Sequence, residues 1–254
     1  MNVFGKNVEM NNVAIKTYKK KHTSIIGRSS LFAGIGFLLT CLFGYAFSFI
    51  VIPNNAKIII MIAAILISMG LSFYVSFKTT TVSYGVYALL YFSYCISSGL
   101  TFESIFSLFN GIGTNHNFEQ LLLIFGIAGA ILTFTGIIGT LIPNKVAMNL
   151  MKFVFILFGI YIFLSLCLML FFFLSPGSLD PLMFGLSILS GLISILYIAF
   201  TFNSMSRTEM FINDSGEEVD KTAINKMCLF FGFILLSSII NLIIVIARLF
   251  IIIR

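Results

Sequence analysis

Long apolar runs separated by short polar connections dominate the chain, and these runs have the length of membrane-spanning helices. Each run is about 20 residues long, which at 1.5 Å per residue crosses a hydrocarbon core of about 30 Å. They lack the alternation of polar and apolar positions that is typical of a transmembrane barrel. Seven such segments are predicted, at Leu31–Ile52, Ile58–Phe77, Tyr84–Phe109, Leu121–Ile142, Phe153–Leu174, Leu182–Phe202 and Met227–Ile253.

Composition supports a membrane protein and excludes a soluble globular domain. Of the 254 residues, 59% are hydrophobic and only 9% are charged. The short connections between the apolar runs favour antiparallel neighbours in one compact bundle without a second domain. The sequence therefore predicts an all-α polytopic membrane protein of the plasma membrane. It comprises a basic N-terminal arm at 1–28 and a seven-transmembrane helix bundle at 29–254.

Lysine and arginine are distributed unevenly about the predicted spans. The arm and the connections at 78–83, 143–152 and 203–226 would share one side and carry twelve of them, against two on the other side. Because positive charge accumulates on the cytoplasmic side, this bias predicts a cytoplasmic N-terminus and a C-terminus outside. The arm is interpreted as an anchor on anionic headgroups, and no nucleic-acid partner is expected.

The last predicted span carries a polar stripe. Ser237, Ser238, Asn241 and Arg248 lie within about one third of the helix circumference. A guanidinium inside a bilayer costs several kcal/mol unless it turns inward and is paired. Glu103 and Arg248 each lie about six residues from the outer ends of their spans, at a common depth of roughly 9 Å. An ion pair between them is predicted, either as a structural clamp or as a gate.

The third predicted span is the other polar helix. Ser93, Ser97, Thr101 and Ser104 share one of its faces. Such hydroxyls could line a path for a cation or a file of water, or they could hydrogen-bond to helix backbone. Both interpretations remain open at this point, and with them the question of whether any metal binds.

The connection from Asn203 to Lys226 holds five of the nine acidic residues. It lacks the twelve-residue spacing and terminal glutamate of an EF-hand, so we expect a solvated loop. The four cysteines lie within or at the ends of spans without metal-ligand spacing. Motifs of zinc proteases, serine hydrolases and phosphate-binding loops are missing, so we do not expect an enzyme.

Two short stretches carry a resemblance to a known family: Gly99–Phe106 in the third predicted span and Ile240–Arg248 in the last. They resemble motifs of the Bax inhibitor family (transmembrane Bax inhibitor motif proteins), in its bacterial branch. The family shows a Gly-Leu-Thr-x-x-x-Ile-Phe run in its third span, matched here by Gly99, Leu100, Thr101, Ile105 and Phe106. Its last helix carries an Asp-Phe-Ile-Asn run with an arginine seven residues after the asparagine, and Ile240, Asn241 and Arg248 match the last part of this pattern. Lys78 falls where the family often has a basic residue.

The resemblance implies a bundle with the last helix at its centre. Some members of the family are pH-sensitive calcium leak channels in which two aspartates share a proton, and others restrain cell death or a membrane protease. At the two aspartate positions this chain has Asn203 and Ser238. They are expected to close the inner end by hydrogen bonding, near Lys78, without the acid sensing that facing carboxylates provide.

Two functions are therefore expected as alternatives. The first is a monomeric cation leak channel, or a regulator of ion homeostasis, with calcium as the ion that the resemblance suggests and with no other cofactor. The second is a non-conducting interaction protein whose basic arm engages a membrane protease or another membrane protein in a stress response.

Overall fold

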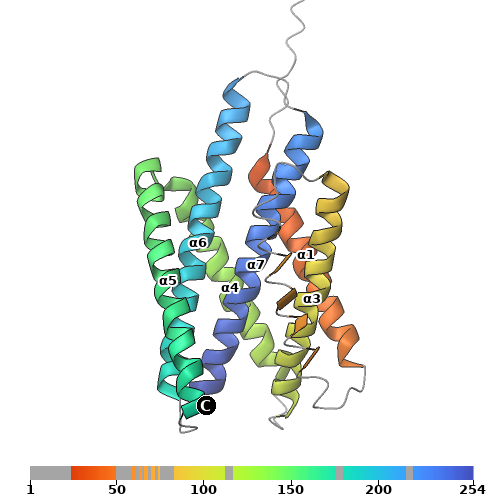
Figure 1. Cartoon of the computed structure of the whole chain (residues 1–254). Helices are drawn as coiled ribbons and strands as arrows, with labels where there is room; N and C mark the ends of the chain where they lie inside the picture. Colours follow the sequence, from red (N-terminus) through yellow and green to blue (C-terminus); the bar gives the residue numbers. More distant parts are fainter. Residues whose placement is uncertain are drawn as a thin grey trace, which may run out of the picture.

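The structure, a computed structural model, is helical throughout the parts of the chain that it describes (Figure 1). Short turns connect the helices, and no strand occurs among these residues. The described residues are 24–49, 83–111, 117–174, 180–215 and 220–253, together with short helical pieces at 59–60, 63–64, 66–67, 70–71 and 74.

Six described helices are long and apolar enough to cross a membrane. The predicted all-helical, multi-pass membrane fold is therefore confirmed for six helices. They are α1 (Ile25–Ser48), α3 (Tyr84–Gly111), α4 (Asn117–Leu141), α5 (Asn144–Leu174), α6 (Asp180–Ser215) and α7 (Lys221–Ile253).

The predicted span at Ile58–Phe77 falls largely outside the described residues, so the count of seven stays a prediction. The packing of its neighbours favours it. Tyr91 of α3 donates to the carbonyl of Phe32 near the start of α1, and further along both helices Gly99 lies against Phe43. These contacts make α1 and α3 parallel, as Figure 1 also shows, an arrangement that fits a predicted span between them.

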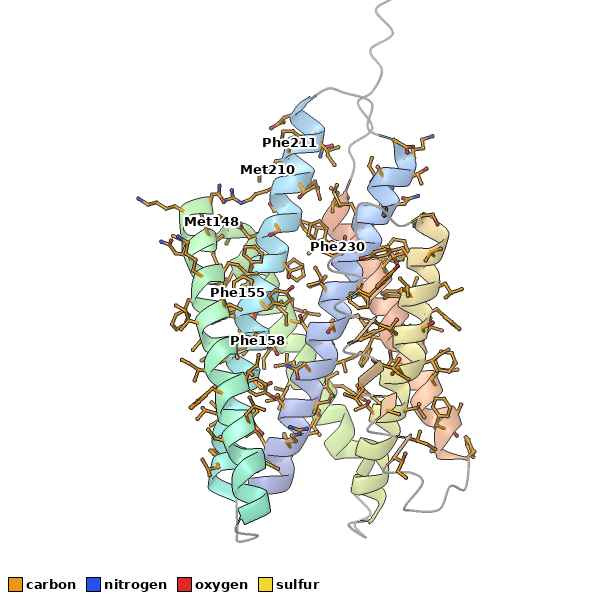
Figure 2. All side chains as sticks on the ribbon, viewed as in Figure 1. Met148, Phe155, Phe158, Met210, Phe211 and Phe230 are labelled. Carbon is orange, nitrogen blue, oxygen red and sulfur yellow. The ribbon has the colours of Figure 1, made fainter. Side chains whose placement is uncertain are left out.

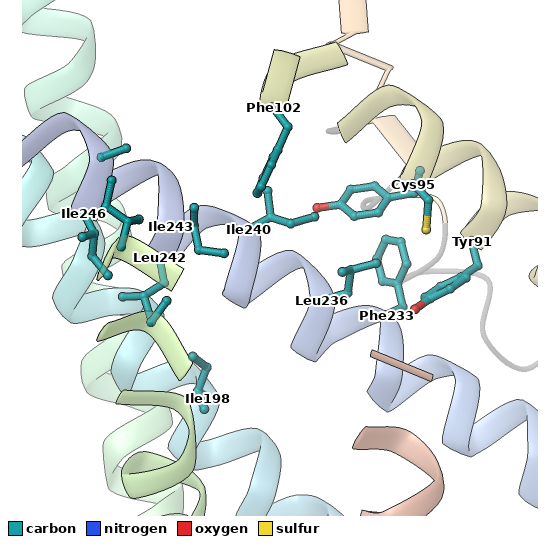
Figure 3. Packing of buried hydrophobic residues seen from close by; sticks show 14 of the residues in the cluster. Tyr91, Cys95, Phe102, Ile198, Phe233, Leu236, Ile240, Leu242, Ile243 and Ile246 are labelled. Carbon is teal, nitrogen blue, oxygen red and sulfur yellow. The ribbon is translucent and has the colours of Figure 1, made fainter. Parts of the chain in front are cut away.

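Helix α7 stands at the centre of the described bundle. Over an 18-residue apolar stretch of α7, 67% of the residues are buried, whereas only 6% are buried over a stretch of the same length in α5. It packs against α1, α3, α4 and α6, and Figure 3 shows its apolar side chains in the main cluster of buried residues. These α7 residues recur every three or four positions, the spacing of one helical face; they include Phe233, Leu236, Ile240, Ile243 and Ile246.

The predicted solvated loop between Asn203 and Lys226 is wrong for its described part. Helix α6 continues to Ser215 and α7 begins at Lys221. The 36 residues of α6 span about 54 Å, more than the roughly 30 Å of a hydrocarbon core. The extension is stabilised by packing, because Met205 and Ser206 are buried and Met205 joins a second cluster with residues of α1 and α7.

The predicted connection at 143–152 is also helical, because α5 begins at Asn144 directly after Pro143. The carbonyl of Pro143 accepts hydrogen bonds from the backbone N–H groups of Val146 and Ala147. A proline suits this place, since the first N–H groups of a helix lack intrahelical partners.

Charged side chains gather at the end of the bundle where α1 begins, drawn at the top in Figure 1 and called the upper end below. This asymmetry favours the predicted orientation, in which the upper end is cytoplasmic. Arg248, near the other end of α7, is the exception among the described side chains. The charged residues toward the upper end are Arg28, Lys145, Lys152, Arg207, Glu209, Asp214, Asp220, Lys221 and Lys226.

Candidate functional site

An aromatic cluster fills the interface between α3 and α7, where the sequence predicted a polar path. The cluster consists of Tyr91 and Tyr94 of α3 and Phe233 of α7, and Figure 3 shows Tyr91 and Phe233. The ring centroid of Phe233 lies 4.8 Å from that of Tyr94 and 6.2 Å from that of Tyr91, both in edge-to-face geometry. All three side chains are buried, with Tyr91 the most exposed at 6%.

The tyrosine hydroxyls of this cluster tie three helices together. The Tyr91 hydroxyl donates to the backbone carbonyl of Phe32 on α1, with an O–O distance of 2.6 Å. The Tyr94 hydroxyl hydrogen-bonds with the side chains of Ser98 and Ser237. Ser237, predicted to line a path, therefore contacts α3 through Tyr94, a partner that the pattern of polar residues did not indicate.

Two of the other predicted path-lining hydroxyls bond to backbone. Ser97 donates to the carbonyl oxygen of Ala64 at 2.6 Å, and Ser238 donates to that of Ile234, one turn earlier, at 2.9 Å. Ser93 and Thr101 are half-buried, whereas the side chain of Ser104 lies outside the described residues. For Ser97 and Ser238 the backbone alternative is the one that the structure supports.

Asn241 makes a polar contact between the two longest helices. Its Nδ2 donates to Ser194 Oγ at 2.6 Å and to Ser190 Oγ at 3.3 Å. The Ser194 hydroxyl in turn donates to the carbonyl of Ser190. The two serines are four residues apart on α6, a spacing that places both on one face and could have identified them as partners.

Replacing Asn241 with leucine is expected to lower the free energy of unfolding by about 0.6–2 kcal/mol, the range measured for interhelical hydrogen bonds in membranes. The chain has no tryptophan, but Cys95 and Cys228 are buried free thiols. A thiol-reactive dye therefore reports thermal unfolding in detergent. Asn149→Leu, at an exposed position of α5, is the matched control and should leave the unfolding temperature unchanged. If both variants lowered the unfolding temperature equally, the role of Asn241 would be contradicted.

Asn203 does not pair with Ser238 to close the inner end, contrary to the expectation. Its Nδ2 donates to the carbonyls of Gly139 and Ile142 at 3.0 and 2.6 Å, and its Oδ1 accepts from Arg207 Nε at 2.7 Å. The last carbonyls of a helix have no intrahelical partner. The side chain of Asn203, 3% exposed, therefore caps the end of α4, which is why it is unavailable to α7.

The expectation that Arg248 turns inward is wrong, because its side chain is exposed. Arg248 lies about six residues from the end of α7, so its long side chain can extend to the headgroup region instead of requiring a buried partner. The side chain of Glu103 lies outside the described residues, and so does Lys78. The predicted Glu103–Arg248 ion pair consequently stays a prediction.

An apolar hollow of about 210 Å³ lies on another side of α7, between α1, α4 and α6. Its walls carry small residues, including Ala33 and Gly34 of α1 and Ala128 and Gly129 of α4. Phe37 and Phe125 also line it, with their ring centroids 5.7 Å apart. With almost no polar surface, this hollow is unsuited to a hydrated ion.

Among the described residues no three histidine, cysteine or acidic side chains come together as a metal site would require. The described interior instead offers neutral oxygen atoms from serine, threonine, tyrosine and asparagine. In comparisons with known proteins, the chain matches no protein-family model and no curated protein.

Proposed function

We propose that the chain is a Bax-inhibitor-like integral membrane protein that regulates the passage of small cations, calcium among them, and that the described packing is its closed form. The observation that carries this proposal is the polar face of the central helix. Ser237 and Asn241 of α7 meet hydroxyl groups of α3 and α6 inside the bundle. Polar groups inside a membrane-spanning bundle are expensive and are commonly associated with ion pathways.

The aromatic cluster of Tyr91, Tyr94 and Phe233 acts as the barrier in this proposal. Its rings occupy the space between α3 and α7, so a cation passes when these helices separate. Separation would free the oxygens of Tyr94, Ser98 and Ser237, because both serines bond to the Tyr94 hydroxyl in the closed form. Neutral oxygens coordinate hard cations more weakly than carboxylates do, which suits a slow leak rather than tight binding.

The test is cation flux into vesicles that contain the purified protein and an indicator of calcium or potassium. Phe233→Ala removes the ring that contacts both tyrosines and is expected to raise the flux severalfold over the wild type. Leu89→Ala, at an exposed position of α3, is the control and should leave the flux unchanged. Absence of flux in the wild type and in the Phe233 variant, at every pH, would contradict the proposal.

A second candidate, a non-conducting interaction protein that regulates a membrane protease or a stress response, is favoured by a different observation. The hydroxyls of Ser97 and Ser238 bond to backbone carbonyls, and the hollow beside α7 is apolar. Both features are what a packed, impermeable bundle requires. Absence of flux, combined with loss of a membrane partner when residues 1–28 are removed, would decide for this candidate.

The setting of either function is the plasma membrane, with a cytoplasmic N-terminus, the C-terminus outside and a monomeric bundle. Support for this orientation comes from the charged upper end described above.

A further inference from the structure

The start of α1 is held by side chains that come from the far end of the sequence. Glu209 of α6 accepts hydrogen bonds at its Oε2 from the backbone N–H groups of Ile25 and Ile26, at 2.9 and 3.1 Å. Arg28 of α1 donates from Nη1 to Oδ1 of Asn225 on α7 at 3.3 Å. The first turn of α1 is thus fastened to both α6 and α7 at the upper end.

A carboxylate is well suited to this place. The first N–H groups of a helix lack intrahelical acceptors and carry a partial positive charge. Ser24 meets one of them, because its Oγ accepts from the N–H of Gly27 at 3.2 Å. Glu209, on a different helix, accepts from two more of these N–H groups. The same contact therefore caps α1 and holds it against α6.

Next to this contact, buried polar side chains lack good hydrogen-bond partners. The thiol of Cys228 lies beside Ser29 and within the electrostatic influence of Arg28 and Glu209. Cys228 and Ser29 are both 0% exposed. The Ser29 hydroxyl has only the weak Cys228 thiol beside it, and it forms no other hydrogen bond among the described residues. On α3, the buried hydroxyl of Tyr87 also has no partner in the described part of the chain. A buried hydroxyl without a good hydrogen bond is unfavourable, and opening to water would relieve this cost.

We propose that Glu209 acts as a clasp that holds the first turns of α1 against α6 and α7, and that its release opens the upper end of the bundle locally and uncovers Cys228. Local openings of this kind require less free energy than global unfolding and occur in contiguous units. The clasp lies where the basic arm joins α1, so it is the point at which binding to the arm would act on the bundle.

Release of the clasp would also change the position of Tyr91 in the aromatic cluster. The carbonyl of Phe32, which accepts from the Tyr91 hydroxyl, lies two turns along α1 from the clasp. Movement of this part of α1 would remove the tie that positions Tyr91 beside Phe233. This link to a barrier rests on the proposed function, whereas the clasp itself does not.

Thiol labelling of the folded protein in vesicles tests the clasp without any measurement of flux. A water-soluble maleimide is added, and mass spectrometry assigns the rate of modification to each cysteine. Glu209→Ala is expected to raise the rate at Cys228 about fivefold, the effect of losing a typical N-cap, and to leave Cys95, deeper in the bundle, unchanged. Glu209→Gln, whose amide oxygen still accepts from N–H groups, should restore most of the protection.

The control is Asp214→Ala, at an exposed position of the same α6 extension, which should label at the wild-type rate. An equal rise at Cys228 and Cys95 would show general loosening of the bundle and would overturn the proposal. An unchanged rate at Cys228 in the folded Glu209→Ala protein would overturn it as well. Flux measured on the same variants separates the clasp from the cation function, because labelling can change while flux stays absent.

Discussion

Replacement of Gly99 with alanine is expected to lower the free energy of unfolding by about 1–3 kcal/mol, and leucine at this position should cost more. A Cβ atom on Gly99 would lie 2.6 Å from Phe43 Cβ, 3.0 Å from the backbone nitrogen of Gly44 and 3.1 Å from the carbonyl oxygen of Thr40. Two of these three atoms belong to the backbone of α1, which cannot move aside without separating the two helices.

Gly85→Ala is the matched control for this substitution, because it lies on the same helix and a Cβ there meets nothing within 4 Å. It should leave stability unchanged or raise it by about 0.5–1 kcal/mol through helix propensity. The thiol-dye unfolding midpoint measures both variants. Equal midpoints for Gly99→Ala and Gly85→Ala would show that the close contact between α1 and α3 does not determine stability.

Replacement of Asn203 with leucine is the second change with a large expected effect. It leaves the carbonyls of Gly139 and Ile142 without their side-chain donor and Arg207 without its acceptor. Each buried polar group left unsatisfied costs about 1–3 kcal/mol, so the unfolding midpoint should fall further than in Asn241→Leu. Asn241 donates to hydroxyls, one of which also bonds to its own helix.

Asn203→Asp separates the two parts of this interaction. An ionised carboxylate keeps the acceptor for Arg207 but has no N–H to donate to the end of α4, where the helix dipole also disfavours negative charge. We expect a loss of stability smaller than that of leucine, because the contact with Arg207 becomes charge-assisted. Wild-type stability in both variants would rule out a structural cap and return Asn203 to consideration as a gating residue.

The membrane architecture was predictable because hydrocarbon imposes a strict requirement on the chain. Backbone groups inside a bilayer must bond within their own segment, so long apolar runs become helices. The ends of the helices were less predictable, since α6 extends past the predicted end at Phe202 into a polar, acid-rich stretch. This stretch packs against α1 through Met205 and Glu209, and these contacts join residues far apart in sequence.

Side-chain partners were predicted less well than helices, for a related reason. Arg248 and Asn203 are both polar residues in apolar surroundings, and the sequence favoured inward pairing for each. Arg248 is exposed near a helix end, whereas Asn203 bonds to a helix terminus and a neighbouring arginine. The choice between such outcomes depends on depth and on the neighbouring helix, which spacing along one helix does not specify.

The aromatic cluster illustrates the same limit. Tyr91 and Tyr94 lie in the third predicted span, where the hydroxyl-bearing face drew attention instead, and helical spacing alone does not distinguish core aromatics from those that face lipid. Their position is defined by Phe233 of α7 and by the carbonyl of Phe32. These partners come from helices that are brought together only in the folded bundle.

Helix α5 packs mainly against α6, and Figure 2 shows Phe155 and Phe158 on it, side chains that are 65% and 43% exposed. In a bilayer this surface would touch fatty chains rather than protein. Exchange of one bulky aliphatic or aromatic residue for another on this surface should leave the packing and stability of the bundle unchanged. The helix is therefore a suitable place to attach a fluorophore or a spin label for following the central helix from a distance.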